Sequence, residues 1–207
     1  MKPYTLLIVL IIALTSCKES NETNSLEQNE KNETATAEVV KKETATKSKN
    51  TSNGTFLCKI NGKDWAYTKA SGIVDTHAKT KKRTAIITFI KKLDRGSETV
   101  QLFYDADTKK LEKVNIHLKV PKNDGKTMTA MYIYHPDTNS IHPNAKISGT
   151  IDLSNPTKAS GNAGVSDLDA RFEKNAIANT DDKLITVEGI NFTGVGYSDL
   201  DKAFGSK

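Results

Sequence analysis

Alternating apolar and polar residues mark several β-strands from about residue 55 onward. The clearest run extends from Val114 to Val120, where every second side chain is apolar and the intervening residues are Asn115, His117 and Lys119. Such a run places one face in a core and the other in water. The same alternation occurs in residues 56–60, 147–153 and 168–172, and further β-rich runs occupy residues 84–90, 100–104, 129–134 and 184–192.

Two of these runs carry more detailed expectations. In the first, alternation predicts that Phe56, Cys58 and Ile60 share the core face. The last run contains Gly189, so we expect a bend or a β-bulge there.

Turn residues separate the predicted strands. Asn61-Gly62 is a strong signal for a tight hairpin, Pro121 ends its strand, and residues 105–108 and 136–139 are typical of hairpin tips. Residues 199–204 could form a single helical turn, because Leu200 and Phe204 are four residues apart. No amphipathic stretch of twelve or more residues could supply a crossover helix, so we do not expect a parallel sheet. The prediction is an all-β fold, a single antiparallel β-sandwich over residues 55–207, with a lipocalin-like β-barrel as the alternative.

The first 54 residues are of two other kinds. Residues 6–14 are nine apolar residues in succession, which suits a secretory signal but spans only about half of a bilayer core. They end in Leu14-Thr15-Ser16-Cys17, which resembles the lipobox of bacterial lipoproteins. This resemblance implies a signal peptide over residues 1–16, cleavage before Cys17 and lipidation of Cys17. In many Gram-negative lipoproteins an aspartate after the cysteine favours retention in the inner membrane. Lys18 occupies that position here, so the resemblance implies the outer membrane as the destination.

Residues 17–54 contain the lipidated cysteine and a predicted disordered tether. Their Asn, Thr, Ser, Glu and Lys residues cannot bury enough apolar surface to offset the entropy lost on folding. A flexible chain of about 37 residues has an average reach of about 33 Å. The tether would hold the β domain away from the bilayer.

A second resemblance lies at the start of the domain. The hairpin Ile60-Asn61-Gly62-Lys63-x-Trp65, together with residues 147–151 and 187–192, is similar to a group of small uncharacterised Gram-negative envelope lipoproteins. The likeness supports the fold class and implies no active residues. Trp65 is the only tryptophan, and core packing is favoured over an exposed sugar-stacking platform.

Candidate chemistry is sparse. His117 falls on the polar face of its strand. His135, Asp137 and His142 bracket a loop that contains proline. An ordinary turn accounts for these three residues, and a metal site is the less favoured alternative. Asp105 and Asp107 lack the glycine and glutamate of an EF-hand loop, so a plain β-turn is favoured over calcium binding. The prediction assigns no catalytic residue, no metal ligand and no cofactor.

Cysteine and charge add two constraints. If Cys17 is acylated, Cys58 is left without a disulfide partner, and its place in the strand predicts a buried, inert thiol. Residues 55–126 contain sixteen Lys and Arg against eight acids, whereas residues 127–207 contain seven against ten. Residues 79–83 and 91–95 form two basic clusters at opposite ends of one predicted strand. They are either solvated loops or contacts for anionic headgroups, lipopolysaccharide or another acidic polymer.

Two classes of function are compatible with the sequence. The favoured one is a lipid-anchored envelope protein whose domain has a non-catalytic binding or structural role. Its partners would be the membrane, through the lipid, and a protein, a glycan or a small apolar ligand. Nucleic acid is not expected, because the basic clusters lack interleaved aromatic residues. The alternative is an envelope enzyme whose site is assembled from scattered residues.

Overall fold

The β domain is seen in a computed structural model that describes residues 54–138, 143–171 and 174–205. Cys17 and all but the last residue of the predicted tether lie outside these ranges, as does His142. The described residues contain ten strands: β1 (Thr55–Ile60), β2 (Lys63–Tyr67), β3 (Lys69–Thr76), β4 (Arg83–Lys92), β5 (Ser97–Asp105), β6 (Leu111–Pro121), β7 (Thr127–Tyr134), β8 (Lys146–Asp152), β9 (Lys158–Asp169) and β10 (Leu184–Asp199). They also contain one short α-helix, α1 (Leu200–Phe204), and the 3-10 turns η1 (Pro136–Thr138), η2 (Lys174–Ala176) and η3 (Thr180–Asp182).

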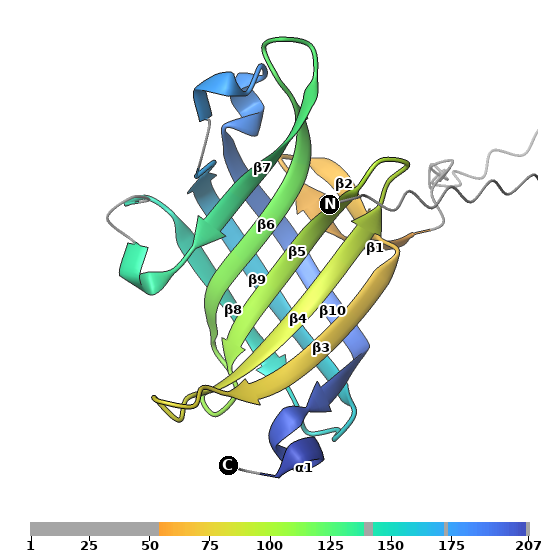
Figure 1. The fold of residues 1–207 in the computed structure, drawn as a ribbon, viewed down its shortest axis with the longest axis vertical. Coiled ribbons are helices and arrows are strands. Elements are labelled where there is room, and N and C mark those ends of the chain that lie inside the picture. Colours follow the sequence, from red (N-terminus) through yellow and green to blue (C-terminus); the bar gives the residue numbers. More distant parts are fainter. Residues whose placement is uncertain (1–53, 139–142, 172–173, 206–207) are drawn as a thin grey trace, which may run out of the picture. The chain divides into compact units, whose positions relative to one another are not determined.

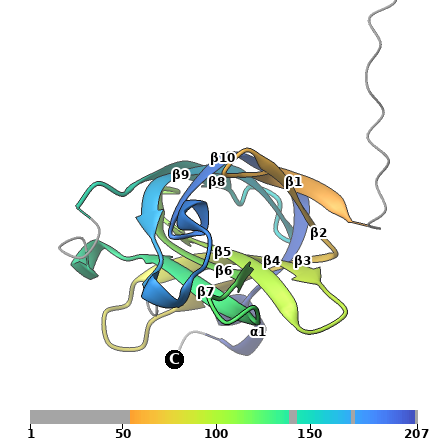
Figure 2. The same cartoon turned by 90° about the horizontal axis from the view of Figure 1, so that it is seen from above.

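The ten strands form one open sheet that folds into two layers. The sheet runs in the order β2-β1-β10-β3-β4-β5-β6-β7, with β9 attached to β10 and β8 attached to β9. Seen from the end, β1, β2, β8, β9 and β10 cover the layer made by β3 to β7 (Figure 2). The predicted all-β sandwich is therefore confirmed. The sheet does not close, so the lipocalin-like barrel is not the fold.

One strand pair departs from the predicted antiparallel pattern. The last part of β10 runs parallel to β3, with Tyr197 opposite Gly72 and Asp199 opposite Val74. A Cβ atom on Gly72 would lie 2.8 Å from the Cβ of Tyr197, so the glycine permits this close approach. The two strands are far apart in sequence, and no local turn could have indicated their pairing. Through this pair β10 connects the two layers (Figure 1).

The core lies between the layers, and its side chains alternate along β4, β5 and β6, as predicted for residues 114–120 of β6. Alternate side chains of these strands face the core and most are buried, for example Phe89 on β4, Tyr104 on β5 and Ile116 on β6. Phe192 of β10 packs from the opposite layer, with its ring centroid 5.5 Å from that of Phe89 and 6.4 Å from that of Tyr104. Aromatic contacts of this kind join the two sheet faces.

Strand β1 breaks the alternation, and the predicted core face is wrong at one position. Phe56 is 53% exposed, whereas Leu57 is 1% exposed and packs in the core together with Cys58 and Ile60. The cause is a β-bulge between Phe56 and Cys58 in the pairing with β2. A bulge inserts one extra residue, so the residues before it turn to the other face.

Most turn predictions are confirmed. Asn61 and Gly62 form the tight turn between β1 and β2, β6 ends at Pro121, and register shifts flank Gly189 between Val187 and Ile190. The predicted terminal helical turn is α1. In the described residues, no helix has the length and apolar character needed to cross a membrane.

The predicted hairpin tip at residues 136–139 is wrong. Pro136–Thr138 form the 3-10 turn η1, and Asn139 lies outside the described residues. The strand before this turn, β7, pairs with β6, and the strand after it, β8, pairs with β9. The loop therefore carries the chain from one layer to the other. Proline and aspartate favour a turn, but they do not determine which strands pair on either side of it.

Candidate functional site

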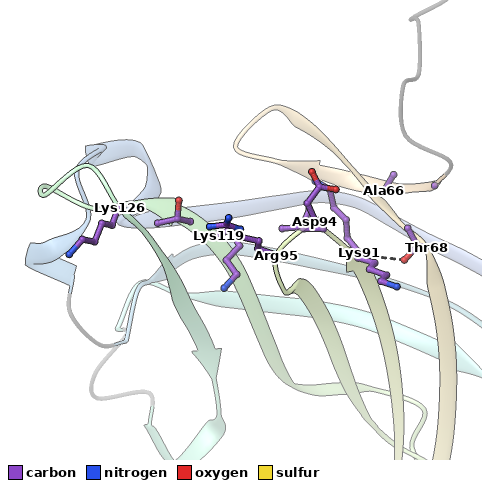
Figure 3. A pocket seen from close by; sticks show the side chains of 11 residues that line it. Ala66, Thr68, Lys91, Asp94, Arg95, Lys119 and Lys126 are labelled. Atoms are coloured by element: carbon purple, nitrogen blue, oxygen red, sulfur yellow. Dashed lines mark hydrogen bonds between the residues drawn. The ribbon is translucent and has the colours of Figure 1, made fainter. Parts of the chain in front are cut away.

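A basic groove opens at the end of the domain where the described chain begins (Figure 3). It has a volume of about 1040 Å³ and is bordered by β2, the β4–β5 turn and the β6–β7 hairpin. Five of its lining side chains are cationic and one is acidic: Lys91, Lys92, Arg95, Lys119, Lys126 and Asp94. We call the pocket that these residues line the basic groove. Gly54, the first described residue, lines it as well.

Two hairpins bring these cations together. Lys91 and Lys92 are the last residues of β4 and lie opposite Glu98 and Ser97 of β5, so the turn between the strands projects Arg95 beside them. The positions 119 and 126 belong to the neighbouring β6–β7 hairpin, whose turn opens at the same end of the sheet (Figure 1). Antiparallel neighbours thus converge at one end although their residues are up to 35 positions apart.

A buried carboxylate holds part of the groove in place. Glu98 is only 8% exposed, and its Oε2 accepts hydrogen bonds from Trp65 Nε1 at 3.0 Å and is 3.2 Å from Lys91 Nζ. Its Oε1 accepts a hydrogen bond from the backbone N–H of Lys119 at 3.1 Å. These partners offset the cost of removing the charge from water. Glu98 therefore joins β2, β4, β5 and β6 beneath the groove.

This arrangement decides the role of Trp65. Its side chain is 4% exposed, and its indole N–H is bound to Glu98. The predicted core packing is confirmed, and the alternative of an exposed sugar-stacking platform is wrong.

The remaining cations leave the groove with excess positive charge. Lys92 and Arg95 are exposed and form no ion pair with the described carboxylates. Lys126 lies 3.9 Å from Asp124, and both side chains are well exposed, so their attraction is screened by water. The ammonium of Lys119 donates to Thr129 Oγ1 at 2.7 Å, which leaves its charge unneutralised. The groove is suited to attract anions.

The second basic cluster, at the other end of β4, is neutralised at Lys82 and Arg83. Lys82 lies 2.6 Å from Glu112, and the hydrogen bond between them raises the pKa of Lys82. Arg83 lies 2.9 Å from Asp199 and 3.4 Å from Asp201, at the start of α1. The prediction that the two clusters occupy opposite ends of one strand is confirmed. Each cluster keeps two exposed cations without a carboxylate partner among the described residues: Lys92 and Arg95 in one, Lys79 and Lys81 in the other. The cluster at residues 91–95 differs in sharing a groove with Lys119 and Lys126 of the β6–β7 hairpin.

The structure keeps the described histidines apart. His77 accepts a hydrogen bond from Thr80 N in the β3–β4 turn, and His117 is half-buried on the outer face of β6. His135 Nδ1 lies 3.3 Å from Asp137, but the third residue of the predicted loop, His142, lies outside the described residues. Among the described residues, no three His, Cys, Asp or Glu side chains are close enough together to hold a metal ion.

The turn that follows β5 is closed by a hydrogen bond of 2.9 Å from the backbone N–H of Lys109 to the carbonyl oxygen of Asp105. Asp105 Oδ1 accepts hydrogen bonds from the backbone N–H groups of Asp107 at 2.9 Å and Thr108 at 2.7 Å. These bonds lower the pKa of Asp105, because they stabilise the ionised carboxylate. The carboxylate is occupied in shaping the turn.

Cys58 is fully buried, and burial raises the pKa of its thiol to about 12. Because the thiolate is the reactive form, we expect Cys58 of the folded chain to react with iodoacetamide at pH 8 at least a hundredfold more slowly than after unfolding in guanidinium chloride. Mass spectrometry of the peptide that contains Cys58 measures both rates without interference from Cys17. Comparable rates would contradict an inert thiol.

Part of the groove was predictable from the sequence. The cluster at residues 91–95 is visible as a charge run, whereas Glu98, Lys119 and Lys126 were not predicted to lie beside it. A signal for Glu98 was present, because this residue is in phase with Val100, Leu102 and Tyr104 on the core face of β5. An acid at a core position requires buried partners. The lipidation site, Cys17, lies outside the described residues.

Comparisons with protein-family models, with curated protein sequences and with solved structures found no match to this chain.

Proposed function

We propose that the chain is a lipid-anchored protein of the cell envelope whose β domain binds an anionic partner and is not an enzyme. The lipobox-like sequence ending at Cys17 supports the anchor, and Lys18 after it favours the outer membrane. The observation that carries the binding role is the basic groove, in which Lys92 and Arg95 lack carboxylate partners among the described residues. Of the partners expected from the sequence, an acidic surface or polymer fits this groove better than a small apolar ligand.

The lipid anchor has a direct test with a matched control. In bacteria fed radiolabelled palmitate, we expect label in the wild-type chain and in Cys58→Ser, and none in Cys17→Ser. The two cysteines are the only ones in the chain, and lipoprotein-type modification uses the thiol that follows the signal. Gel autoradiography of the immunoprecipitated chain gives the readout. Persistent label in Cys17→Ser would overturn the anchor.

A further inference from the structure

We propose that the basic groove docks on the phosphate headgroups of the membrane to which the chain is anchored. This inference rests on the proposed function and deepens it, because it names the anionic partner. The interaction is electrostatic attraction between the lysine and arginine side chains of the groove and the phosphate groups of a phospholipid surface. Three features of the domain favour that surface over other acidic partners.

The first feature is the position of the groove. Gly54 lines the groove, so the segment that leads back to Cys17 joins the domain at this end. The helix α1 lies at the opposite end (Figure 1). The tether expected from the sequence would average about 33 Å in reach, and it would keep the groove at high effective concentration near the bilayer. The end of the domain that holds the basic groove is therefore the end that the tether attaches closest to the membrane.

The second feature is unneutralised charge. Lys92, Arg95 and Lys126 are exposed, and only Lys126 lies near a carboxylate, which is itself well exposed. Each lysine or arginine near an anionic membrane surface strengthens binding about fivefold, so three such residues contribute roughly a hundredfold. The effect falls off over a Debye length of about 8 Å at physiological salt. A tethered domain needs no more than this modest attraction to remain docked.

The third feature is apolar surface beside the groove. Phe56 is 53% exposed and lies opposite Ala66, a groove residue, on the β1–β2 hairpin. Leu93, at the β4–β5 turn, is half-exposed and lines the groove. Aromatic and apolar side chains flanked by cations suit the boundary between headgroups and acyl chains. At the other end, the pocket beside the exposed Phe204 is lined by three cations and two acids, against five cations and one acid in the basic groove.

Lysine footprinting of the full chain tests the docking. The chain is reconstituted through its own lipid into vesicles of phosphatidylcholine alone, or of phosphatidylcholine with 30% phosphatidylglycerol, and is acetylated briefly. We expect Lys92 and Lys126 to react at least threefold more slowly on the vesicles that contain phosphatidylglycerol, and this difference to vanish in 0.5 M salt. Lys79 and Lys81, at the opposite end of β4, serve as internal controls and should react equally on both.

Two charge-matched variants give a second measurement. The groove variant carries Lys92→Gln, Arg95→Gln and Lys126→Gln, and the control carries Lys79→Gln, Lys81→Gln and Lys158→Gln. Each removes three positive charges, but the control changes only the end near α1. We expect the groove variant to lose the protection of Lys119 by phosphatidylglycerol and the control to keep it.

The outcomes separate the docking from the anchor. Equal acetylation of the groove lysines on both kinds of vesicle would overturn the docking. Protection of these lysines by soluble polygalacturonate, but not by phosphatidylglycerol, would also overturn it and would leave an acidic polymer as the partner. If the chain does not float with phosphatidylcholine vesicles, the anchor fails. Flotation of that chain with phosphatidylglycerol vesicles would then support the docking by itself, and its absence would overturn it.

Discussion

Replacing Trp65 by alanine is expected to lower the free energy of unfolding by about 4 kcal/mol, as truncation of a buried aromatic side chain does. Trp65 is 4% exposed, and its indole N–H is bound to Glu98. The substitution leaves a cavity and also removes a donor from a buried carboxylate. Folded domains are stable by only about 5–15 kcal/mol, so the variant would be close to unfolding at ambient temperature.

Urea unfolding followed by circular dichroism measures this loss, since the variant contains no tryptophan for fluorescence. Phe56→Ala is the matched control, because it removes an exposed aromatic side chain from the paired strand. It should change stability by no more than about 0.5 kcal/mol. Trp65→Phe separates the two contributions, since it retains most of the packing and loses the donor. Equal losses for Trp65→Ala and Phe56→Ala would contradict the buried role of Trp65.

The second large effect is expected at Gly149, where alanine should destabilise the domain by roughly 2 to 5 kcal/mol. A Cβ atom at this position would lie 2.3 Å from the carbonyl oxygen of Asn162 and 2.9 Å from the Cα of Ala163. Both are backbone atoms of the paired strand β9, which cannot rotate away. Gly149 also has a φ of +154°, a conformation that other residues rarely adopt.

Gly164→Ala is the control for this prediction. Gly164 lies in β9 opposite Ser148, next to the pair formed by Gly149 and Ala163. A Cβ there would meet only Ser148 Oγ, at 3.4 Å, so we expect a change of less than about 1 kcal/mol. Urea unfolding compares the two variants, and amide hydrogen exchange in β8 and β9 shows whether the damage is local. A Gly149→Ala variant as stable as Gly164→Ala would contradict the close contact between the strands.

The sequence predicted those strands whose side chains alternate and whose turns are local. Strands β4, β5 and β6 meet both conditions. Strand β3 escaped prediction because it has a central glycine, Gly72, and only two large apolar residues, Ile73 and Val74. Its position depends on pairing with β4 and β10, which supply contacts that no local pattern encodes.

The same limit applies to finer features. Phe56 and Leu57 are both apolar, so alternation alone could not determine which one enters the core, and the bulge decides it. The cluster at residues 91–95 was visible as a charge run, but its closure into a groove required β6 and β7. The importance of Glu98 depends on Trp65, which comes 33 residues earlier in the chain.

Strand β10 pairs with strands of both layers, and this sets the order in which the fold can be completed. Strands β3 to β7 pair with their neighbours in sequence, whereas the β1–β2 hairpin and the β8–β9 hairpin are both attached to β10. The final sheet therefore cannot be assembled until β10, the last strand, is available. Pairing β10 with β1 and β3 joins segments that are far apart in the sequence, and such pairing is slow because it must overcome the entropy of loop closure. A polypeptide that threads through a translocation channel from its N-terminus would remain incomplete until its C-terminus emerged.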